Sequence, residues 1–166
     1  MKSIAIIALC AVMLGVGMAE VSRTSPTAWA VEPDEPERIE TVLQSTARYE
    51  LTAAERDTVE RVVMAEAGAE PYEGQIAVAQ CILNACELED MRPDEIVIEY
   101  QYTDKRPDPT DEVKAAVSAV FDYGETVTDA EILYFYAPAL CESEWHETQN
   151  YVMTIGGHRF FEEVQK

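Results

Sequence analysis

The spacing of apolar residues predicts helices over most of the chain between residues 51 and 124. The first predicted helix covers residues 51–67, and Thr52 with Glu55 forms a capping box at its start. Its apolar stripe consists of three valines at helical spacing, Val59, Val62 and Val63. This stripe indicates the side of the helix that packs into the core.

Three more helices are expected after the first. The second runs from Pro71 to about Glu87 and is apolar on most sides, which predicts a place at the centre of the core. A short third helix is predicted over residues 93–99. Thr110 caps a fourth helix, which Gly124 is expected to end.

The C-terminal part of the chain has strand patterns instead. Residues 132–136 are rich in aromatic and aliphatic side chains and predict one strand. Residues 151–161 predict two short strands joined by a tight turn at Gly156-Gly157. The pattern as a whole favours an α+β protein that is mainly helical and has a small β element near its C-terminus.

Glu66 stands in the apolar stripe of the first helix, where the i, i+3, i+4, i+7 pattern would place another aliphatic residue. A carboxylate on that side is costly to bury unless it is paired, protonated or used. Partial burial favours the neutral form of a carboxyl group, which can then donate a proton near neutral pH. An ion pair with Arg61 or Lys105 is the alternative explanation.

The first 19 residues have the pattern of a secretory signal, with one lysine, no acid and an apolar run over residues 4–19. The run is short for a membrane-spanning helix, which needs about 20 residues. Cleavage is expected after Ala19 or after Ala30, and an uncleaved anchor is the alternative. We therefore expect residues 1–30 to be a signal peptide or N-terminal anchor and the protein to be secreted or extracytoplasmic. Residues 31–50 predict an acidic linker, which leaves 51–166 as the functional domain.

The chain is strongly acidic, with 32 acidic and 12 basic residues and a net charge of −20. Such a charge excludes electrostatic binding to nucleic acid or to an anionic membrane surface. Membrane contact is therefore expected only through residues 1–19. A polysaccharide partner would have to be held by hydrogen bonds and stacking, and solubility is the simpler explanation of the charge.

Cys81, Cys86 and Cys141 remain if Cys10 leaves with a signal peptide. Cys81 and Cys86 point in different directions on the second helix, so they are not expected to pair. A bridge from either one to Cys141 stays open, as does the alternative that all three are plain small apolar residues. The sequence has no Cys-x-x-Cys motif and no histidine cluster, so we expect no metal and no cofactor.

Other side chains suited to a binding site follow Glu66. Glu73 is either a helix-start charge or a second carboxylate, which would have to lie about 5 to 9.5 Å from Glu66. Tyr102 and Tyr136 belong to a group of aromatic residues that suit sugar faces or, equally, ordinary strand packing. His158 is expected to bond a substrate, to orient Glu66 or to make a local structural bond.

Residues 64–84, MAEAGAEPYEGQIAVAQCILN, resemble the opening motif of the cell wall hydrolase family typified by the spore-cortex-lytic (SleB-type) enzyme. Three further pieces follow in the same order as in that family. They are YQYT at 100–103, LYFYAP at 133–138 and TIGGHRFF at 154–161. The resemblance covers about residues 55–162, and the ordered set of four is more specific than any single piece.

This resemblance implies a lysozyme-like, resuscitation-factor-like catalytic domain that cuts the glycan backbone of peptidoglycan. The family's catalytic glutamate matches Glu66. Substrate contacts are expected from six further residues, Glu73, Gln101, Tyr102, Tyr134, Tyr136 and His158. The chain departs from the family at Ala85 and Ala137, where relatives usually have arginine and asparagine.

The leading hypothesis is a lytic transglycosylase that cleaves between N-acetylmuramic acid and N-acetylglucosamine, with Glu66 as the single acid and base. A hydrolytic muramidase is the first alternative, with Glu73 or an acid of residues 104–112 as a second carboxylate. A non-catalytic glycan-binding or spore-structural module is the other alternative, and the changes at Ala85 and Ala137 favour it slightly.

Overall fold

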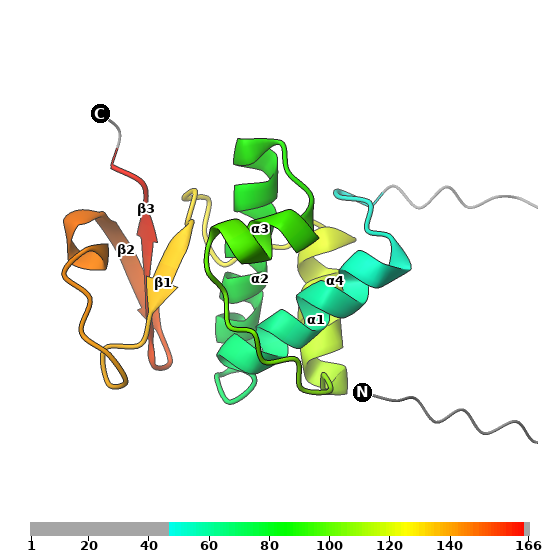
Figure 1. Ribbon diagram of the computed structural model, residues 1–166, viewed down its shortest axis with the longest axis horizontal. Helices are drawn as coiled ribbons and strands as arrows, with labels where there is room; N and C mark the ends of the chain where they lie inside the picture. Colours follow the sequence, from blue (N-terminus) through cyan, green and yellow to red (C-terminus); the bar gives the residue numbers. More distant parts are fainter. Residues whose placement is uncertain (1–46, 165–166) are drawn as a thin grey trace, which may run out of the picture. The chain divides into compact units, whose positions relative to one another are not determined.

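The computed structural model of the protein describes residues 47–164. Within them, four α-helices precede a small antiparallel sheet (Figure 1). The helices are α1 (Ala53–Ala67), α2 (Tyr72–Glu89), α3 (Pro93–Glu99) and α4 (Asp111–Phe121). The strands are β1 (Tyr134–Tyr136), β2 (Asn150–Ile155) and β3 (His158–Glu162), and the 3-10 helix η1 (His146–Thr148) lies between β1 and β2. The predicted fold class, α+β and mainly helical, is confirmed. The predicted signal or anchor and most of the predicted linker lie outside the described residues.

The predicted start of α1 is confirmed in detail. The Thr52 side chain accepts a hydrogen bond from the Glu55 backbone N–H at 3.3 Å, and the Thr52 N–H donates to Glu55 Oε2 at 2.8 Å. These two bonds satisfy backbone donors that the first helical turn leaves free. The stripe valines Val59, Val62 and Val63 are fully buried, so the predicted core side of α1 is also confirmed.

Helix α2 is the centre of the core, as its composition predicts. Every residue from Gly74 to Cys86 is buried, and α1, α3 and α4 all pack against this helix (Figure 1). The helix begins at Tyr72, one residue after Pro71, which occupies the cap position instead of the first turn. It ends at Glu89, two residues beyond the predicted end.

Helix α3 has the predicted bounds and ends in a way that matters for the site. The N–H of Tyr102 donates to Val97 at 3.0 Å, and the N–H of Gln101 donates to Ile98 at 3.1 Å. This pair of bonds is a Schellman motif, and it requires the left-handed conformation that Gln101 adopts at φ 57°. The motif turns the chain after α3 back toward α1.

Helix α4 starts as predicted, since Thr110 accepts a hydrogen bond from the Val113 N–H at 3.2 Å. It ends at Phe121, earlier than the Gly124 that was expected to stop it. Gly124 instead adopts φ 71° in the turn that follows the helix.

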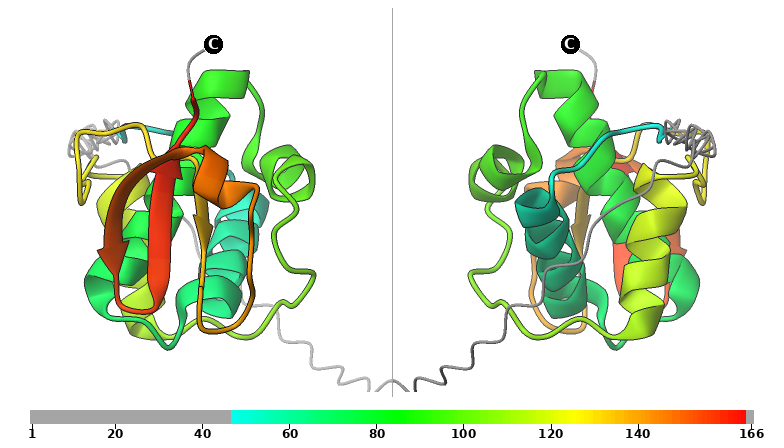
Figure 2. Two further views of the ribbon diagram at one scale, coloured as in Figure 1. Left: turned by 90° about the vertical axis from the view of Figure 1, so that its left-hand side faces the viewer. Right: turned by 90° about the vertical axis from the view of Figure 1, so that its right-hand side faces the viewer.

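The sheet has the strand order β1-β3-β2, and both pairs are antiparallel. The predicted hairpin at Gly156-Gly157 is confirmed, whereas the strand predicted over 132–136 is limited to its last three residues. Ile132 and Leu133 are buried in the hydrophobic core just before β1. Figure 2 (left view) looks onto the sheet, with the helices behind it.

The hairpin turn is joined to the connection between α1 and α2 through Glu70. Its carboxylate accepts a hydrogen bond from the Gly157 N–H at 2.7 Å. A Cβ on Gly156 would lie 1.8 Å from Glu70 Oε2, and Gly156 has φ 55°, so this turn needs glycine. The contact fixes the position of the hairpin relative to the helices.

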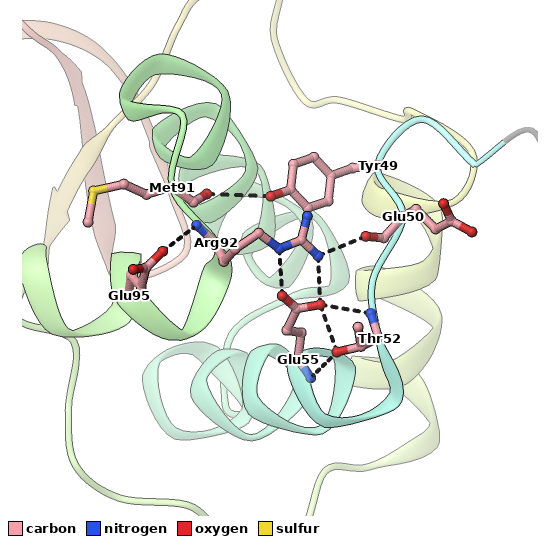
Figure 3. Close-up of polar contacts among 7 residues, drawn as sticks. All are labelled: Tyr49, Glu50, Thr52, Glu55, Met91, Arg92 and Glu95. Atoms are coloured by element: carbon pink, nitrogen blue, oxygen red, sulfur yellow. Dashed lines mark hydrogen bonds and ion pairs between the residues drawn. The ribbon is translucent and has the colours of Figure 1, made fainter.

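Arg92 joins the start of α3 to the start of α1 (Figure 3). Its guanidinium donates to both oxygens of Glu55 at 2.6 Å and to the carbonyl of Glu50 at 3.0 Å. The same group lies 5.0 Å from the centre of the Tyr49 ring, so it also makes a cation–π contact. We call this group of residues, Tyr49, Glu50, Thr52, Glu55 and Arg92, the Arg92 clamp.

The three described cysteines are free thiols, Cys81 and Cys86 buried and Cys141 exposed. The bridge to Cys141 that the sequence left open is therefore absent from this structure. Burial raises the pKa of Cys86 to about 11, so this thiol stays protonated and inert. None of the helices between residues 47 and 164 combines the length and apolarity that a membrane span requires.

Candidate active site

A groove of about 990 Å³ lies between the helices and the edge strand β1. Its lining comes from α1, the ends of α2 and α3, the turn after α3, β1 and the start of η1. The lining residues are Glu66, Glu89, Met91, Glu99, Tyr100, Gln101, Tyr102, Leu133, Tyr134, Phe135, Trp145 and His146. The groove contains three carboxylates and a set of aromatic rings, which is the composition expected of a carbohydrate site.

Glu66 lies in the last turn of α1 and is half-buried at the groove wall. Its Oε1 accepts a hydrogen bond from the backbone N–H of Thr103 at 2.8 Å. Within residues 47–164 it has no ion pair. Arg61 binds Asp57 and Asp108 instead, each at 2.9 Å. The ion-pair explanation of Glu66 is therefore wrong. Among the described residues, its carboxyl group has one hydrogen-bond partner, the Thr103 N–H, and the residue borders the groove.

Tyr102, Gln101 and Tyr134, which were expected to contact the substrate, line the same groove. The Tyr102 hydroxyl is buried and has no hydrogen-bond partner among the described residues. Burial, and then the neighbouring Cys81 and Glu66, raise the pKa of Tyr102 well above its ordinary value. Tyr102 is therefore a neutral hydroxyl group near the carboxyl group of Glu66.

Three other predicted site residues do not line the groove. Glu73 is exposed in the first turn of α2. Tyr136 lies at a separate hollow of about 390 Å³, where its hydroxyl donates a hydrogen bond to Glu147. His158 is 7% exposed, and its Nδ1 lies 3.4 Å from Glu70 Oε1. This Nδ1 has no hydrogen-bond partner among the described residues, so the roles expected of His158 stay predictions.

The groove also includes residues that the sequence reasoning missed, notably Glu89, Glu99 and Trp145. Glu89 and Glu99 are the last residues of α2 and α3, where the helix dipole disfavours a negative charge. This unfavourable placement can be recognised from the sequence and could have pointed to both residues. Trp145 lies in an irregular loop before η1, where no periodic pattern points to it.

The described residues, 47 to 164, contain no group of three or more His, Cys, Asp or Glu side chains arranged to hold a metal ion. The chemistry that this arrangement supports is proton transfer by a carboxyl group. Glu66 has the position for it, because one of its oxygens is fixed by Thr103 while the residue borders an open groove.

Comparison with known proteins identifies the family and the fold of the chain. A family model described as Cell Wall Hydrolase matches residues 69–161. The catalytic domain of the germination-specific lytic transglycosylase SleB from Bacillus anthracis is 26% identical, with a TM-score of 0.54 over 68% of this chain and 97% of that one. The catalytic domain of Bacillus cereus SleB is 24% identical, with a TM-score of 0.56 over 68% and 93%, and supports the fold. No curated protein matches the chain in sequence.

Proposed function

Because this chain belongs to the cell wall hydrolase family, we propose that it cleaves the glycan strands of peptidoglycan in the groove and uses Glu66 as its catalytic acid. The observation that carries the proposal is the half-buried carboxyl group of Glu66, which borders the groove and has one fixed partner, the Thr103 N–H at 2.8 Å. The family match begins at residue 69, so the role of Glu66 rests on this geometry and on its motif.

The reaction that we favour is lytic cleavage between N-acetylmuramic acid and N-acetylglucosamine. Protonated Glu66 gives its proton to the bridging oxygen, and the bond from that oxygen to C1 of the muramic acid breaks. The carboxylate then takes the proton of the muramic acid 6-hydroxyl, whose oxygen bonds to C1 and closes an anhydro ring. Glu66 ends the cycle protonated, and acid–base help of this kind contributes about 10² to 10⁴-fold to the rate.

A hydrolytic reaction is the second candidate, because Glu89 and Glu99 line the groove together with Glu66. Either one is available as a second carboxylate that activates water. Glu73 and the acids of residues 104–112 do not line this groove, so they are weaker candidates for that role. Mass spectrometry of the released fragments separates the two reactions, since a hydrolytic product is one water heavier than an anhydro product.

The test of the catalytic assignment is Glu66→Gln, which keeps the size of the side chain and removes the transferable proton. We expect the variant to release soluble fragments from purified peptidoglycan at least about 100-fold more slowly than the unaltered protein. Glu60→Gln is the matched control, since Glu60 belongs to the same helix and does not line the groove. Activity of Glu66→Gln close to that of the control would exclude the assignment.

The proposed substrate places the protein outside the cytoplasm, in a cell wall or a spore. Residues 1–30 then act as a signal peptide or an N-terminal anchor, and any membrane contact is made through residues 1–19. Digestion of spore-cortex and vegetative peptidoglycan side by side would show which wall the groove accepts.

A further inference from the structure

Trp145 is a large apolar side chain that stays 53% exposed although it lines the groove. Its ring centre lies 4.9 Å from that of Tyr134, and the two planes make an angle of 82°. The Tyr134 ring is in turn stacked on Tyr100, with centres 5.8 Å apart and planes 19° apart. Trp145 and Tyr134 therefore form a corner of two nearly perpendicular rings, which we call the aromatic corner.

The aromatic corner is shaped for a ring that has one apolar face and a polar edge. Exposed tryptophan surface is unfavourable in water, and a ligand that covers it recovers that free energy. A pyranose chair has a C–H face that can cover an indole, together with hydroxyl groups that can reach Tyr134 and the nearby carboxylates. Because Glu66 lines the same groove, a glycan strand placed at Glu66 extends along the lining that includes the corner.

We propose that the aromatic corner is a sugar subsite and that Trp145 stacks on one pyranose ring of the bound glycan. This proposal rests on the proposed function, because it assumes that the groove holds a glycan strand. Trp145 then binds and positions the substrate, whereas Glu66 transfers the proton.

The charges around the aromatic corner select the kind of sugar. The Tyr100 hydroxyl donates to Glu89 Oε1 at 3.3 Å, and Glu99 also lines the groove. Among residues 47–164, no lysine or arginine belongs to the lining. Muramic acid brings a lactyl group and the carboxylates of a stem peptide, which these acids repel, whereas N-acetylglucosamine is neutral. The ring on Trp145 is therefore N-acetylglucosamine.

The test uses the intrinsic fluorescence of the full chain. The sequence has two tryptophans, so Trp145 is the only one in a Trp29→Phe variant. A Glu66→Gln change in the same chain is expected to slow any cleavage during the titration. Chitotetraose, which consists of N-acetylglucosamine alone, is added, and we expect a saturable change in the intensity and wavelength of the Trp145 emission.

Calorimetry with chitotetraose then compares variants of the Glu66→Gln chain. We expect Trp145→Ala to weaken binding about tenfold or more and Trp145→Phe, which keeps a stacking face, to weaken it less. Tyr151→Ala is the matched control, because Tyr151 is 52% exposed and does not line the groove. It should bind like its parent, and thermal unfolding checks that all variants are folded.

The outcomes separate this proposal from the proposed function. Unchanged Trp145 emission on binding, equal affinity of Trp145→Ala and its parent, or no binding of chitotetraose would each overturn the subsite. In a chain with Glu66 intact, peptidoglycan cleavage that depends on Glu66 but is unchanged by Trp145→Ala would overturn the subsite and leave the function standing. Absence of any cleavage by the unaltered protein would instead overturn the function.

Discussion

The carboxyl group of Glu66 is oriented by a backbone donor, not by another side chain. The Thr103 N–H that binds it follows the Schellman motif of α3, where Gln101 accepts a left-handed conformation. Non-glycine residues in that conformation are uncommon and concentrate at sites where the surrounding structure fixes them. The left-handed turn therefore places one backbone N–H against the proposed acid.

Removing that N–H tests its contribution. Thr103→Pro deletes the donor, and we expect the turnover number on peptidoglycan to fall by about 10- to 100-fold while KM changes little, because the acid loses its orientation. Thr103→Ala keeps the N–H and serves as the control, with activity close to that of the unaltered protein. Equal rates for the two variants, both folded by thermal unfolding, would contradict the role of this bond.

At the residue scale, the sequence pointed to Glu66 as a candidate acid, but it predicted only some of the residues that line the groove around it. Glu66 could be found because it breaks an apolar stripe that is otherwise fully buried. The groove around it is formed by residues up to 80 positions away in the sequence, His146 among them, and no local pattern records such contacts. Trp145 was missed for that reason.

At the element scale, the Arg92 clamp joins the start of α3 to the start of α1 (Figure 3). Glu66 belongs to α1, and Thr103, which binds it, follows α3 in the chain. The Arg92 guanidinium lowers the pKa of Glu55 from its ordinary 4.5 to about 2. A lowered pKa in the folded protein stabilises it fully above about pH 4.5, and this stabilisation is lost as the pH falls toward about 2.

Glu55→Gln isolates this charge, because glutamine can still complete the capping box with Thr52. We expect the free energy of unfolding to fall by about 1 kcal/mol at neutral pH, since Arg92 is half exposed and solvent weakens the pair. The difference from the unaltered protein should shrink as the pH drops from about 4.5 toward 2. Urea unfolding across this range measures it, and a pH-independent difference would argue against the charge as its source.

Most element boundaries could be predicted, because they depend on local chemistry. The cap at Thr52, the helix over 93–99 and the hairpin at Gly156-Gly157 all follow from neighbouring residues. The first strand begins at Tyr134, two residues later than predicted. Ile132 and Leu133 are buried in the core, and the Leu133 N–H still donates to the Phe161 carbonyl of β3 at 2.9 Å. Burial in the core leaves the same apolar pattern in the sequence as a strand does.

At the scale of the whole molecule, the net charge of −20 acts on any anionic substrate. Peptidoglycan carries stem-peptide carboxylates, so the protein and its polymer repel each other at low salt. Salt shortens the range of that repulsion from about 30 Å at 0.01 M to about 8 Å at 0.15 M.

We therefore expect the initial rate of peptidoglycan cleavage to rise about two- to tenfold between those two salt concentrations. Binding of neutral chitotetraose to the Glu66→Gln variant is the control, and it should change little with salt. A rate that instead falls as salt is added would mean that an attractive contact dominates the encounter.

The bond between Glu70 and Gly157 joins residues that are 87 positions apart in the sequence. Contacts within a helix and between helices that follow one another in the sequence close shorter loops, whereas this one closes a long loop and has a larger entropy cost. We therefore expect the hairpin to dock after the helices have collapsed, which makes the sheet side of the groove the last part to form. A newly made chain would then not cleave glycan until folding is almost complete, even though Glu66 is already in place on its helix.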